Sequence, residues 1–407
     1  MLNTASQASH PISMQLPRSA RPLHGPSNGS SLMRREDLMD AEGLSTDELF
    51  CFLQAKRNED FSYSHILSSM CTTPHPVAVQ AHNLFMETNL GDPGLFPGTA
   101  TLEDRLIRWF ADLYHEPSAG GCTTSGGTES NIQVLRFCKK TKNVKEPNII
   151  VPASAHFSFE KACGMMDIEM RVVPVDEQYR MKTDAAGELI DKNTCCIVGV
   201  AGTTEYGMTD PIPALGKLAE QEGVHLHVDA AFGGYVLPFL DDAPPFDFSV
   251  PGVGSIAVDP HKMGLSTIPS GVLMVRDERV FCNLLVETPY LTTKQAYSLT
   301  GTRPGASVAA AYAVMAYLGR KGMKALVTGC MENTRRMIEG MEAFGVHRKV
   351  TPDVNVATFE HVSVPSPWVV SYTRKGDLRI VCMPHVTRDV VEAFLSDFGE
   401  SYVSHIS

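Results

Sequence analysis

Short apolar runs alternate with helical patterns through the middle of the chain. Residues 101–115 place apolar side chains at the three- and four-residue spacing of one helix face. Six apolar runs of strand length follow, at residues 148–151, 168–175, 195–200, 224–228, 255–258 and 271–275. Helical stretches separate several of them, which is typical of a largely parallel sheet buried on both faces. The pattern therefore predicts an α/β domain.

The pattern changes beyond Pro304. Two long helical stretches precede two strand-like runs and a last helical stretch, which together predict a smaller C-terminal α+β domain; their ranges are 305–322, 323–345, 355–362, 378–383 and 387–400. At the other end, residues 1–35 hold no acidic residue and little periodicity, so we expect a disordered tail or a start assigned too early, with Met33 as the true start. Ser45 and Glu48 then have the spacing of a helix capping box. The expected organisation is this tail, an N-terminal helical segment, a large domain and a small domain: 1–35, 36–95, 96–303 and 304–407.

Composition narrows the possible partners. Acidic residues outnumber basic ones by 46 to 35, for a net charge of -11, which argues against nucleic acid or an anionic membrane as a partner. No apolar run approaches the roughly 18 residues of a membrane span. The ten cysteines form no C-x-x-C pair, so we expect reduced thiols in a cytoplasmic protein rather than a zinc site or a disulfide framework.

Four chemically capable residues follow four of the predicted strands. They are His156, Thr204, Asp229 and Lys262. Taken singly, each has an ordinary alternative: a core histidine, an unremarkable hydroxyl, a turn or helix cap, and a surface lysine. In an open α/β sheet, however, ligands bind beyond the carboxyl ends of the strands. Their shared position therefore predicts one common site.

A glycine-rich stretch, "GCTTSGGTESN" at residues 121–131, leads into another helical pattern. Glycines before a helix let backbone N–H groups approach an anion, which the helix N-terminus also favours. The alternative is a flexible loop with Thr128 as the helix cap. A phosphate cradle, a lysine, a carboxylate and a histidine together suggest pyridoxal 5'-phosphate. Lys262 would form the imine, Asp229 would hold the pyridine nitrogen protonated and His156 would stack on the ring. Apolar runs on both sides of Lys262 would favour the neutral amine that this chemistry needs.

Several motifs in this order resemble the group II pyridoxal-phosphate-dependent amino-acid decarboxylases: "TTSGGTESN", "HVDAAFGG" and "DPHKMG". "NLGDPGLFPGTATLE" and "LRIVCMPHVTRD" are most similar to the archaeal L-tyrosine/L-aspartate decarboxylases. The resemblance runs from about Gly43 to about Phe398. It implies a type I, aspartate-aminotransferase-like fold, with a mostly parallel seven-stranded sheet in the large domain and a small C-terminal α+β domain. It also implies a homodimer with active sites at the subunit interface.

The resemblance assigns roles around the cofactor. Lys262 resembles the lysine that binds the cofactor, and Asp229 the partner of the pyridine nitrogen. Ala231 resembles the small residue beneath the ring, His156 the stacking histidine, and Thr204 the hydroxyl near the phenolic oxygen. Four further positions match contacts to the phosphate, the last of them from the other subunit: Gly127, Thr128, His261 and Thr302.

The resemblance also points to substrate contacts. Arg379 lies where the family holds the substrate carboxylate. Tyr290 matches a mobile-loop tyrosine of aromatic amino-acid decarboxylases that protonates the substrate carbon. Asn89 and Asp92 match positions lining the substrate pocket of glutamate decarboxylases.

The implied reaction is amino-acid decarboxylation. It would convert L-tyrosine to tyramine for methanofuran biosynthesis, L-aspartate to β-alanine for coenzyme A biosynthesis, or both. L-Glutamate decarboxylation and a carbon–carbon lyase activity, like that of sphingosine-phosphate lyase, are the enzymatic alternatives. A catalytically dead, cofactor-binding scaffold is a third, although every expected catalytic position is filled.

Overall fold

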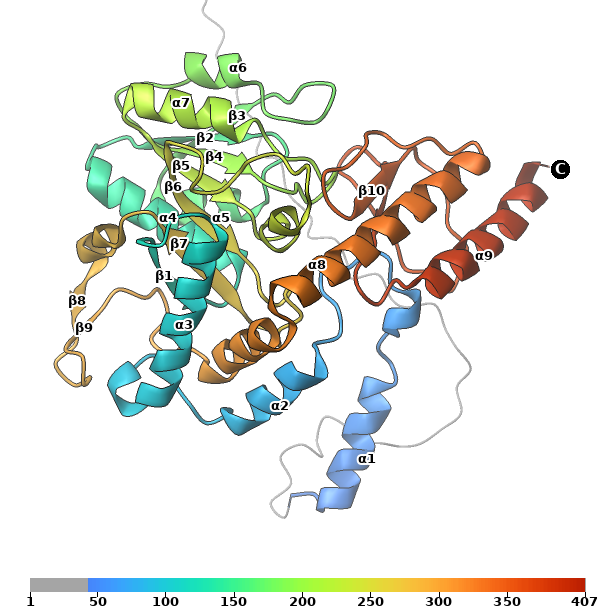
Figure 1. Cartoon of the computed structure of the whole chain (residues 1–407), viewed down its shortest axis with the longest axis horizontal. Helices are drawn as coiled ribbons and strands as arrows, with labels where there is room; N and C mark the ends of the chain where they lie inside the picture. Colours follow the sequence, from blue (N-terminus) through green and yellow to red (C-terminus); the bar gives the residue numbers. More distant parts are fainter. Residues whose placement is uncertain (1–42, 407) are drawn as a thin grey trace, which may run out of the picture. The chain divides into compact units, whose positions relative to one another are not determined.

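The computed structural model describes residues 43–406 (Figure 1). The chain divides into two compact units, Met1–Phe61 and Ser62–Ser407. The tail expected at residues 1–35 lies outside the described residues. In the first unit, helix α1 (Thr46–Arg57) begins at the predicted capping box: the Glu48 N–H donates to Ser45 Oγ at 3.3 Å, and the Ser45 N–H donates to Glu48 Oε2 at 3.0 Å. This local prediction is confirmed.

A seven-stranded sheet forms the centre of the second unit, in the order β1-β7-β6-β5-β4-β2-β3. Only β7 runs against its neighbours, so the predicted, largely parallel sheet is confirmed. Strands β2 to β7 coincide with the six apolar runs. The remaining strand, β1, lies in the glycine-rich stretch, where "GGCTT" offers too few apolar residues to be recognised. The strands are β1 (Gly120–Thr124), β2 (Asn148–Pro152), β3 (Glu169–Val173), β4 (Thr194–Val200), β5 (His225–Asp229), β6 (Val253–Val258) and β7 (Gly271–Val275).

Helices cover both faces of the sheet (Figure 1). On one face, Val198 of β4 belongs to a core shared with α4 (Gly127–Lys142) and α5 (Ser158–Met166). On the other, Ile197 belongs to a core shared with α8 (Gly305–Ala343) and with three further helices, α3, α6 and α7. Helix α3 buries Leu106 and Phe110, as its spacing predicts. The bounds of the other three helices are α3 (Pro97–Leu113), α6 (Thr183–Glu188) and α7 (Ile212–Glu222).

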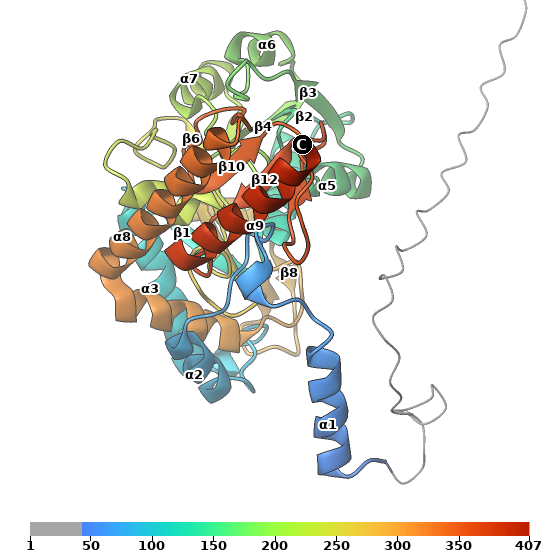
Figure 2. The ribbon, with the colours of Figure 1, turned by 90° about the vertical axis from the view of Figure 1, so that its right-hand side faces the viewer.

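Helix α8 (Gly305–Ala343) consists of two helical pieces that meet at Gly319. Gly319 has φ +57 and ψ -174, a conformation that favours glycine, and so the predicted pair of helices is confirmed. Beyond it, a three-stranded sheet in the order β10-β12-β11 shares a core with α8 and α9. Figure 2 shows these two helices beside β10 and β12. The elements are β10 (Val356–Phe359), β11 (Ser371–Tyr372), β12 (Leu378–Val381) and α9 (Arg388–Ile406).

A small hairpin lies between β7 and α8. Its strands are β8 (Val286–Glu287) and β9 (Gln295–Ala296). Helix α2 (Pro76–Leu84) packs against α8. Short 3-10 turns complete the described chain: η2 (Tyr63–His65), η3 (Pro93–Leu95), η4 (Gly233–Tyr235), η5 (Leu237–Phe239) and η6 (Glu278–Leu284). Within residues 43–406, no helix has both the length and the apolar character needed to cross a bilayer.

Candidate active site

A cavity of about 360 Å³ opens beyond the carboxyl ends of β2, β4, β5 and β6. This is the edge at which the strand-end residues were expected to converge. Eight of the expected site residues line the cavity: Gly127, Thr128, His156, Thr204, Asp229, Ala231, His261 and Lys262. Gly127 follows β1 and Lys262 follows β6. The two residues are far apart in the chain but lie at one cavity because both strands belong to the same sheet.

Lys262 forms an ion pair within the cavity. Its Nζ lies 3.1 Å from Asp259 Oδ2, and the Asp259 side chain is only 3% exposed. The sequence led us to expect apolar surroundings for Lys262, whereas the structure places a buried carboxylate beside it. Lys262 therefore has a charged neighbour as well as apolar ones.

The N-terminus of α4 faces the same cavity through Gly126 and Gly127. Gly126 has φ +148, and a Cβ there would lie 3.1 Å from Cε1 of His261. A Cβ on Gly127 would lie 3.0 Å from Cβ of Ala231. Side chains at these positions would crowd the cavity, and the first N–H groups of a helix have no intrahelical acceptor. The glycines therefore keep the N-terminus of α4 open to the cavity, a setting that favours an anion.

Asp229, at the end of β5, is 5% exposed and receives two hydrogen bonds. Asn131 Nδ2 donates to its Oδ2 at 3.0 Å, and the Ala231 N–H donates to its Oδ1 at 3.1 Å. Each carboxylate oxygen thus accepts one hydrogen bond from a buried donor of the same chain. The carboxylate therefore has a defined orientation at the cavity wall.

His156 follows β2 and packs 4.0 Å, centroid to centroid, from the ring of Phe157. The Ser158 N–H donates to its Nδ1 at 3.3 Å. Burial lowers the pKa of His156 from 6.5, and the charge of Asp229 opposes this only in part. At neutral pH the ring is therefore a neutral, oriented aromatic surface at the cavity.

Arg379 does not line the cavity but contacts a residue that does. Its Nε donates to the carbonyl of Thr204, and its Nη1 donates to the carbonyl of Ser68 at 2.9 Å and to Ser371 Oγ at 3.0 Å. Arg379 is 7% exposed, and burial lowers its pKa to about 10. The guanidinium is thus fixed by backbone carbonyls immediately behind the lining residue Thr204.

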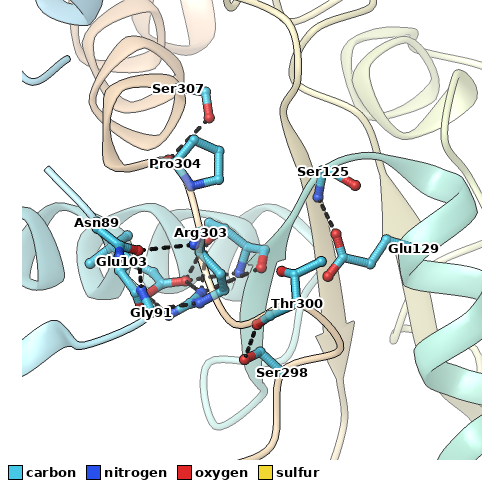
Figure 3. Close-up of polar contacts among 12 residues, drawn as sticks. Asn89, Gly91, Glu103, Ser125, Glu129, Ser298, Thr300, Arg303, Pro304 and Ser307 are labelled. Carbon is cyan, nitrogen blue, oxygen red and sulfur yellow. Dashed lines mark hydrogen bonds and ion pairs between the residues drawn. The ribbon is translucent and has the colours of Figure 1, made fainter. Parts of the chain in front are cut away.

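Thr302 does not line the 360 Å³ cavity but lines a second cavity, of about 60 Å³. Next to it, Arg303 Nη1 lies 2.6 Å from Glu103 Oε1 and also donates to Thr123 Oγ1 at 3.1 Å (Figure 3). Burial alone would raise the pKa of Glu103, but the Arg303 guanidinium outweighs it and lowers that pKa. Arg303 therefore anchors the start of α8 to β1 and α3.

Three of the expected substrate contacts, Tyr290, Asn89 and Asp92, lie on or against the segment between Arg276 and Arg303 that carries the hairpin. Tyr290 is 83% exposed and does not line the cavity of its own chain. Asp92 accepts from the Thr292 N–H at 3.1 Å. Asn89 accepts from the Arg303 N–H at 3.1 Å (Figure 3). Asn89 and Asp92 thus brace this segment, and neither of them lines the 360 Å³ cavity.

Arg276 anchors the opposite end of the same segment. It follows β7 and donates to the carbonyls of Val253 and Phe248 at 2.8 Å each. Its Nη1 also lies 3.0 Å from Glu116 Oε2. The stretch between Arg276 and Arg303 is therefore attached to the large sheet at both ends.

Sequence reasoning missed several buried polar residues beside the site: Asn131, Ser158, His227, Ser255 and Asp259. One signal was available in "HLHVD", where alternate residues place His225, His227 and Asp229 on one face of a strand. Polar residues on a strand face that packs against a helix need partners. The partner on α4, Asn131, is set by tertiary packing and has no such local signal.

The chain belongs to the pyridoxal-dependent decarboxylases. Residues 86–357 match the family described as the pyridoxal-dependent decarboxylase conserved domain. Among curated relatives, the probable L-tyrosine/L-aspartate decarboxylase of Methanoculleus marisnigri is 63% identical over 88% of this chain and 98% of its own length. The probable L-aspartate decarboxylase of Archaeoglobus fulgidus is 48% identical over 85% of this chain and 97% of its own length.

Solved structures agree with the type I fold. The glutamate decarboxylase of Lactobacillus brevis superposes with a TM-score of 0.82 at 22% identity, covering 93% of this chain and 95% of its own. A sphingosine-1-phosphate lyase of Burkholderia pseudomallei has a TM-score of 0.80 at 27% identity, covering 94% and 93%. The expected family, fold and cofactor are confirmed: the chain is a pyridoxal-phosphate-dependent amino-acid decarboxylase.

The lining has the groups that pyridoxal phosphate needs. A primary amine, a carboxylate with a defined orientation and a helix N-terminus face one cavity. Two buried oxygens of lining residues, Ser154 Oγ and Asp259 Oδ1, have no hydrogen-bond partner within the described residues. Buried polar atoms require partners, and a bound polar group can supply them. The residues present therefore fit the cofactor.

Proposed function

We propose that this enzyme removes the α-carboxylate of L-tyrosine to give tyramine, of L-aspartate to give β-alanine, or of both. The observation that carries the decarboxylase chemistry is the convergence of Lys262, Asp229 and His156 with the N-terminus of α4 in one cavity. The two substrates are those in the printed names of relatives that are 63% and 60% identical over 88% of this chain.

In this proposal the cavity residues hold the cofactor. Lys262 would bind it covalently, Asp229 would pair with its ring nitrogen, and His156 and Ala231 would enclose the ring. Thr204 would supply a hydroxyl to the phenolic oxygen. When bound, pyridoxal phosphate supplies the electron sink that accepts the electron pair left as carbon dioxide departs. Gly127, Thr128 and His261 would bind the phosphate, helped by the helix N-terminus.

Arg379 is proposed to hold the substrate carboxylate. Its guanidinium is almost fully buried, and its donors to Thr204 and Ser68 restrict its movement. A positioned guanidinium can hold a carboxylate in a defined geometry. This would orient the bond to be broken, because the leaving carboxylate is the group held.

We further propose a homodimer in which Tyr290 and Thr302 act at the active site of the partner subunit. Tyr290 is 83% exposed in its own chain, and Thr302 lies outside the 360 Å³ cavity. The Tyr290 hydroxyl would protonate the substrate carbon after carbon dioxide leaves, while its segment excludes water. Asn89 and Asp92, which brace that segment, would set its position beside the substrate.

The two products place the enzyme in two biosynthetic routes, with tyramine supplied to methanofuran and β-alanine supplied to coenzyme A. The ten cysteines are all free, which supports a reducing compartment, and we place the enzyme in the cytoplasm.

The decisive experiment incubates purified protein and pyridoxal phosphate with L-tyrosine, L-aspartate and L-glutamate in parallel. Carbon dioxide and amine are measured, with the Lys262→Ala variant as the blank. We expect release from tyrosine, aspartate or both. Release from glutamate alone would overturn the substrate assignment, and no release from any of the three would overturn the proposed function.

A further inference from the structure

A line of polar side chains runs behind the cavity wall, between β5, β6 and α4. It links His225, Ser255, His227, Asn131 and Asp229 through successive hydrogen bonds. His225 Nε2 lies 2.8 Å from Ser255 Oγ, and that oxygen lies 2.9 Å from His227 Nδ1. His227 Nε2 lies 2.9 Å from Asn131 Oδ1, and Asn131 Nδ2 lies 3.0 Å from Asp229 Oδ2. The line therefore ends on the carboxylate at the cavity wall.

The carboxylate fixes which way the Asn131 amide points. An ionised Asp229 only accepts hydrogen bonds, so the Asn131 atom facing it must be the NH₂ group. The same NH₂ group donates to Ser158 Oγ at 3.0 Å. The reversed amide would place its oxygen against the carboxylate. The Asn131 oxygen therefore faces His227.

This orientation determines the proton positions along the rest of the line. Because the Asn131 oxygen only accepts, His227 must carry its proton on Nε2. In a neutral ring, His227 Nδ1 then accepts from the Ser255 hydroxyl. With its one proton used, Ser255 accepts from His225 Nε2. Every hydrogen bond in the line thus donates toward Asp229.

Burial keeps the rings of His225 and His227 neutral. His227 and Ser255 are fully buried, and Asn131 is 1% exposed. Burial lowers the pKa of His227 to about 4, with the Asp229 charge opposing it, and lowers the pKa of His225 to about 3, with His227 adding to the effect. The directed line therefore persists throughout the neutral pH range.

Asn131 also reaches the second cofactor-facing side chain. Ser158, which accepts from Asn131, donates its backbone N–H to Nδ1 of His156. One carboxamide therefore connects the supports of Asp229 and of His156. At the far end, His225 lines another cavity, of about 410 Å³, at the opposite edge of the sheet.

We infer that Asn131 and His227 are positioning residues for the decarboxylase reaction: their directed hydrogen bonds hold the Asp229 carboxylate in a fixed orientation toward the cofactor ring. This inference rests on the proposed role of Asp229. The alternative is that these side chains only satisfy one another's hydrogen bonds in the core. If their role is purely structural, substitutions in the line will lower stability without changing cofactor binding.

The first test is the tautomer of His227 in the cofactor-free protein, measured by ¹⁵N NMR of the histidine side chains. Comparison with His227→Gln assigns its signals among the 14 histidines. We expect a proton on Nε2 and none on Nδ1 at neutral pH. The opposite tautomer, or a doubly protonated ring, would overturn the directed line, whatever the enzyme's substrate.

The second test compares variants of the line. Asn131→Leu and His227→Leu remove donors, whereas His227→Gln keeps a donor at the position of Nε2. We expect the two leucine variants to bind pyridoxal phosphate roughly 10- to 100-fold more weakly and to lose kcat similarly, with little change in KM, and glutamine to restore most of both. Ser255→Ala, which removes only the next link, should show a smaller loss of the same kind and provides a milder change should a leucine variant not fold.

Asn148→Leu is the matched control. Asn148, at the start of β2, is buried like Asn131, but its side chain bonds to Asp191 and Thr194 outside the cavity. It should lower the melting temperature as Asn131→Leu does, without changing cofactor affinity or kcat. If the variants of the line behave like this control, the inference is overturned. If the wild-type protein neither binds the cofactor nor decarboxylates, the proposed function fails instead, and the NMR result stands apart from it.

Discussion

The cavity wall and the hairpin segment differ in how much of the site they complete within one chain. On the wall, Asp229, His156 and Lys262 are held by short contacts to residues of the same chain. On the segment between Arg276 and Arg303, Tyr290 is 83% exposed. The folding of a single chain therefore positions the side chains of the wall, whereas Tyr290 does not line the cavity of its own chain.

This difference separates the residues of the cavity wall from Tyr290, which is proposed to complete the site of a partner subunit. Residues at strand ends are positioned by a sheet whose strands are buried on both faces, and the helix α4 end is positioned with them. Tyr290 has no such framework, and its proposed role requires a second copy of the chain. Changes on the wall should therefore alter each chain's own site, and changes on the segment should alter the partner's.

The largest expected effect is at Lys262. Lys262→Ala should abolish turnover and the visible absorption of the covalently bound cofactor, although phosphate contacts can still retain it. Lys262→Arg is the control, because it keeps a cation beside Asp259 but cannot form the covalent bond. Both variants should be inactive in a carbon dioxide assay. Activity at the wild-type level in either would remove Lys262 from the mechanism.

Asp229→Asn should fold and bind the cofactor, yet lose about a thousandfold in kcat. A pair of charges near contact is worth roughly 4 kcal/mol at an effective dielectric of 20, which corresponds to that factor. Asp247→Asn is the control, since Asp247 is also 5% exposed and pairs with His115 at 2.9 Å away from the cavity. A loss below tenfold at Asp229 would mean that it does not face the ring nitrogen.

Tyr290→Phe should still release carbon dioxide but form amine roughly 100-fold more slowly, the usual contribution of a general acid. Protonation at the wrong carbon would divert the reaction to an aldehyde and an aminated cofactor, which product analysis detects. Tyr317→Phe, at another exposed tyrosine, is the control. Normal amine formation without aldehyde would leave Tyr290 as a packing residue.

A mixing experiment sharpens the comparison directly. Inactive Lys262→Ala chains and impaired Tyr290→Phe chains are unfolded together and refolded at equal amounts. If Tyr290 acts at the partner's site, mixed dimers contain one intact site, and roughly a quarter of all sites regain activity. If each chain completes its own site, mixing restores nothing.

The interior behind the wall should give the stability of the fold a pH dependence. The pKa values of His225 and His227, about 3 and about 4, lie below the ordinary 6.5. As the pH falls from 6.5 to about 4, the unfolded chain binds protons that the folded chain excludes. The free energy of unfolding should therefore fall by about 1.4 kcal/mol per pH unit for each histidine.

Urea unfolding at several pH values measures this slope. His227→Gln should reduce it by one histidine's share, whereas a substitution at the exposed His347, His347→Gln, should leave it unchanged. An unchanged slope in His227→Gln would show that the ring is already protonated in the fold.

The sequence predicted the parts of the fold that depend on local pattern. Strands β2 to β7 were visible as apolar runs, and β2, β4 and β7 are buried throughout. The residues following β2, β4, β5 and β6 met in one cavity because parallel strands share an edge. Strand β1 was missed because its glycines carry no pattern. Asp259 and Asn131 were missed because their roles arise from contacts to Lys262 and Asp229 that packing brings about. The exposure of Tyr290 likewise has no signature in a local motif.

The two arginine anchors have an evolutionary consequence. Arg276 and Arg303 tie the ends of the hairpin segment to a carbonyl at the start of β6 and to the carboxylates of Glu116 and of Glu103 on α3. Mutation can therefore lengthen, shorten or recompose the stretch between them without displacing Lys262 at the cavity wall. If the segment contacts the substrate as proposed, a lineage can keep the cavity intact and change the amino acids it accepts by altering this one surface segment.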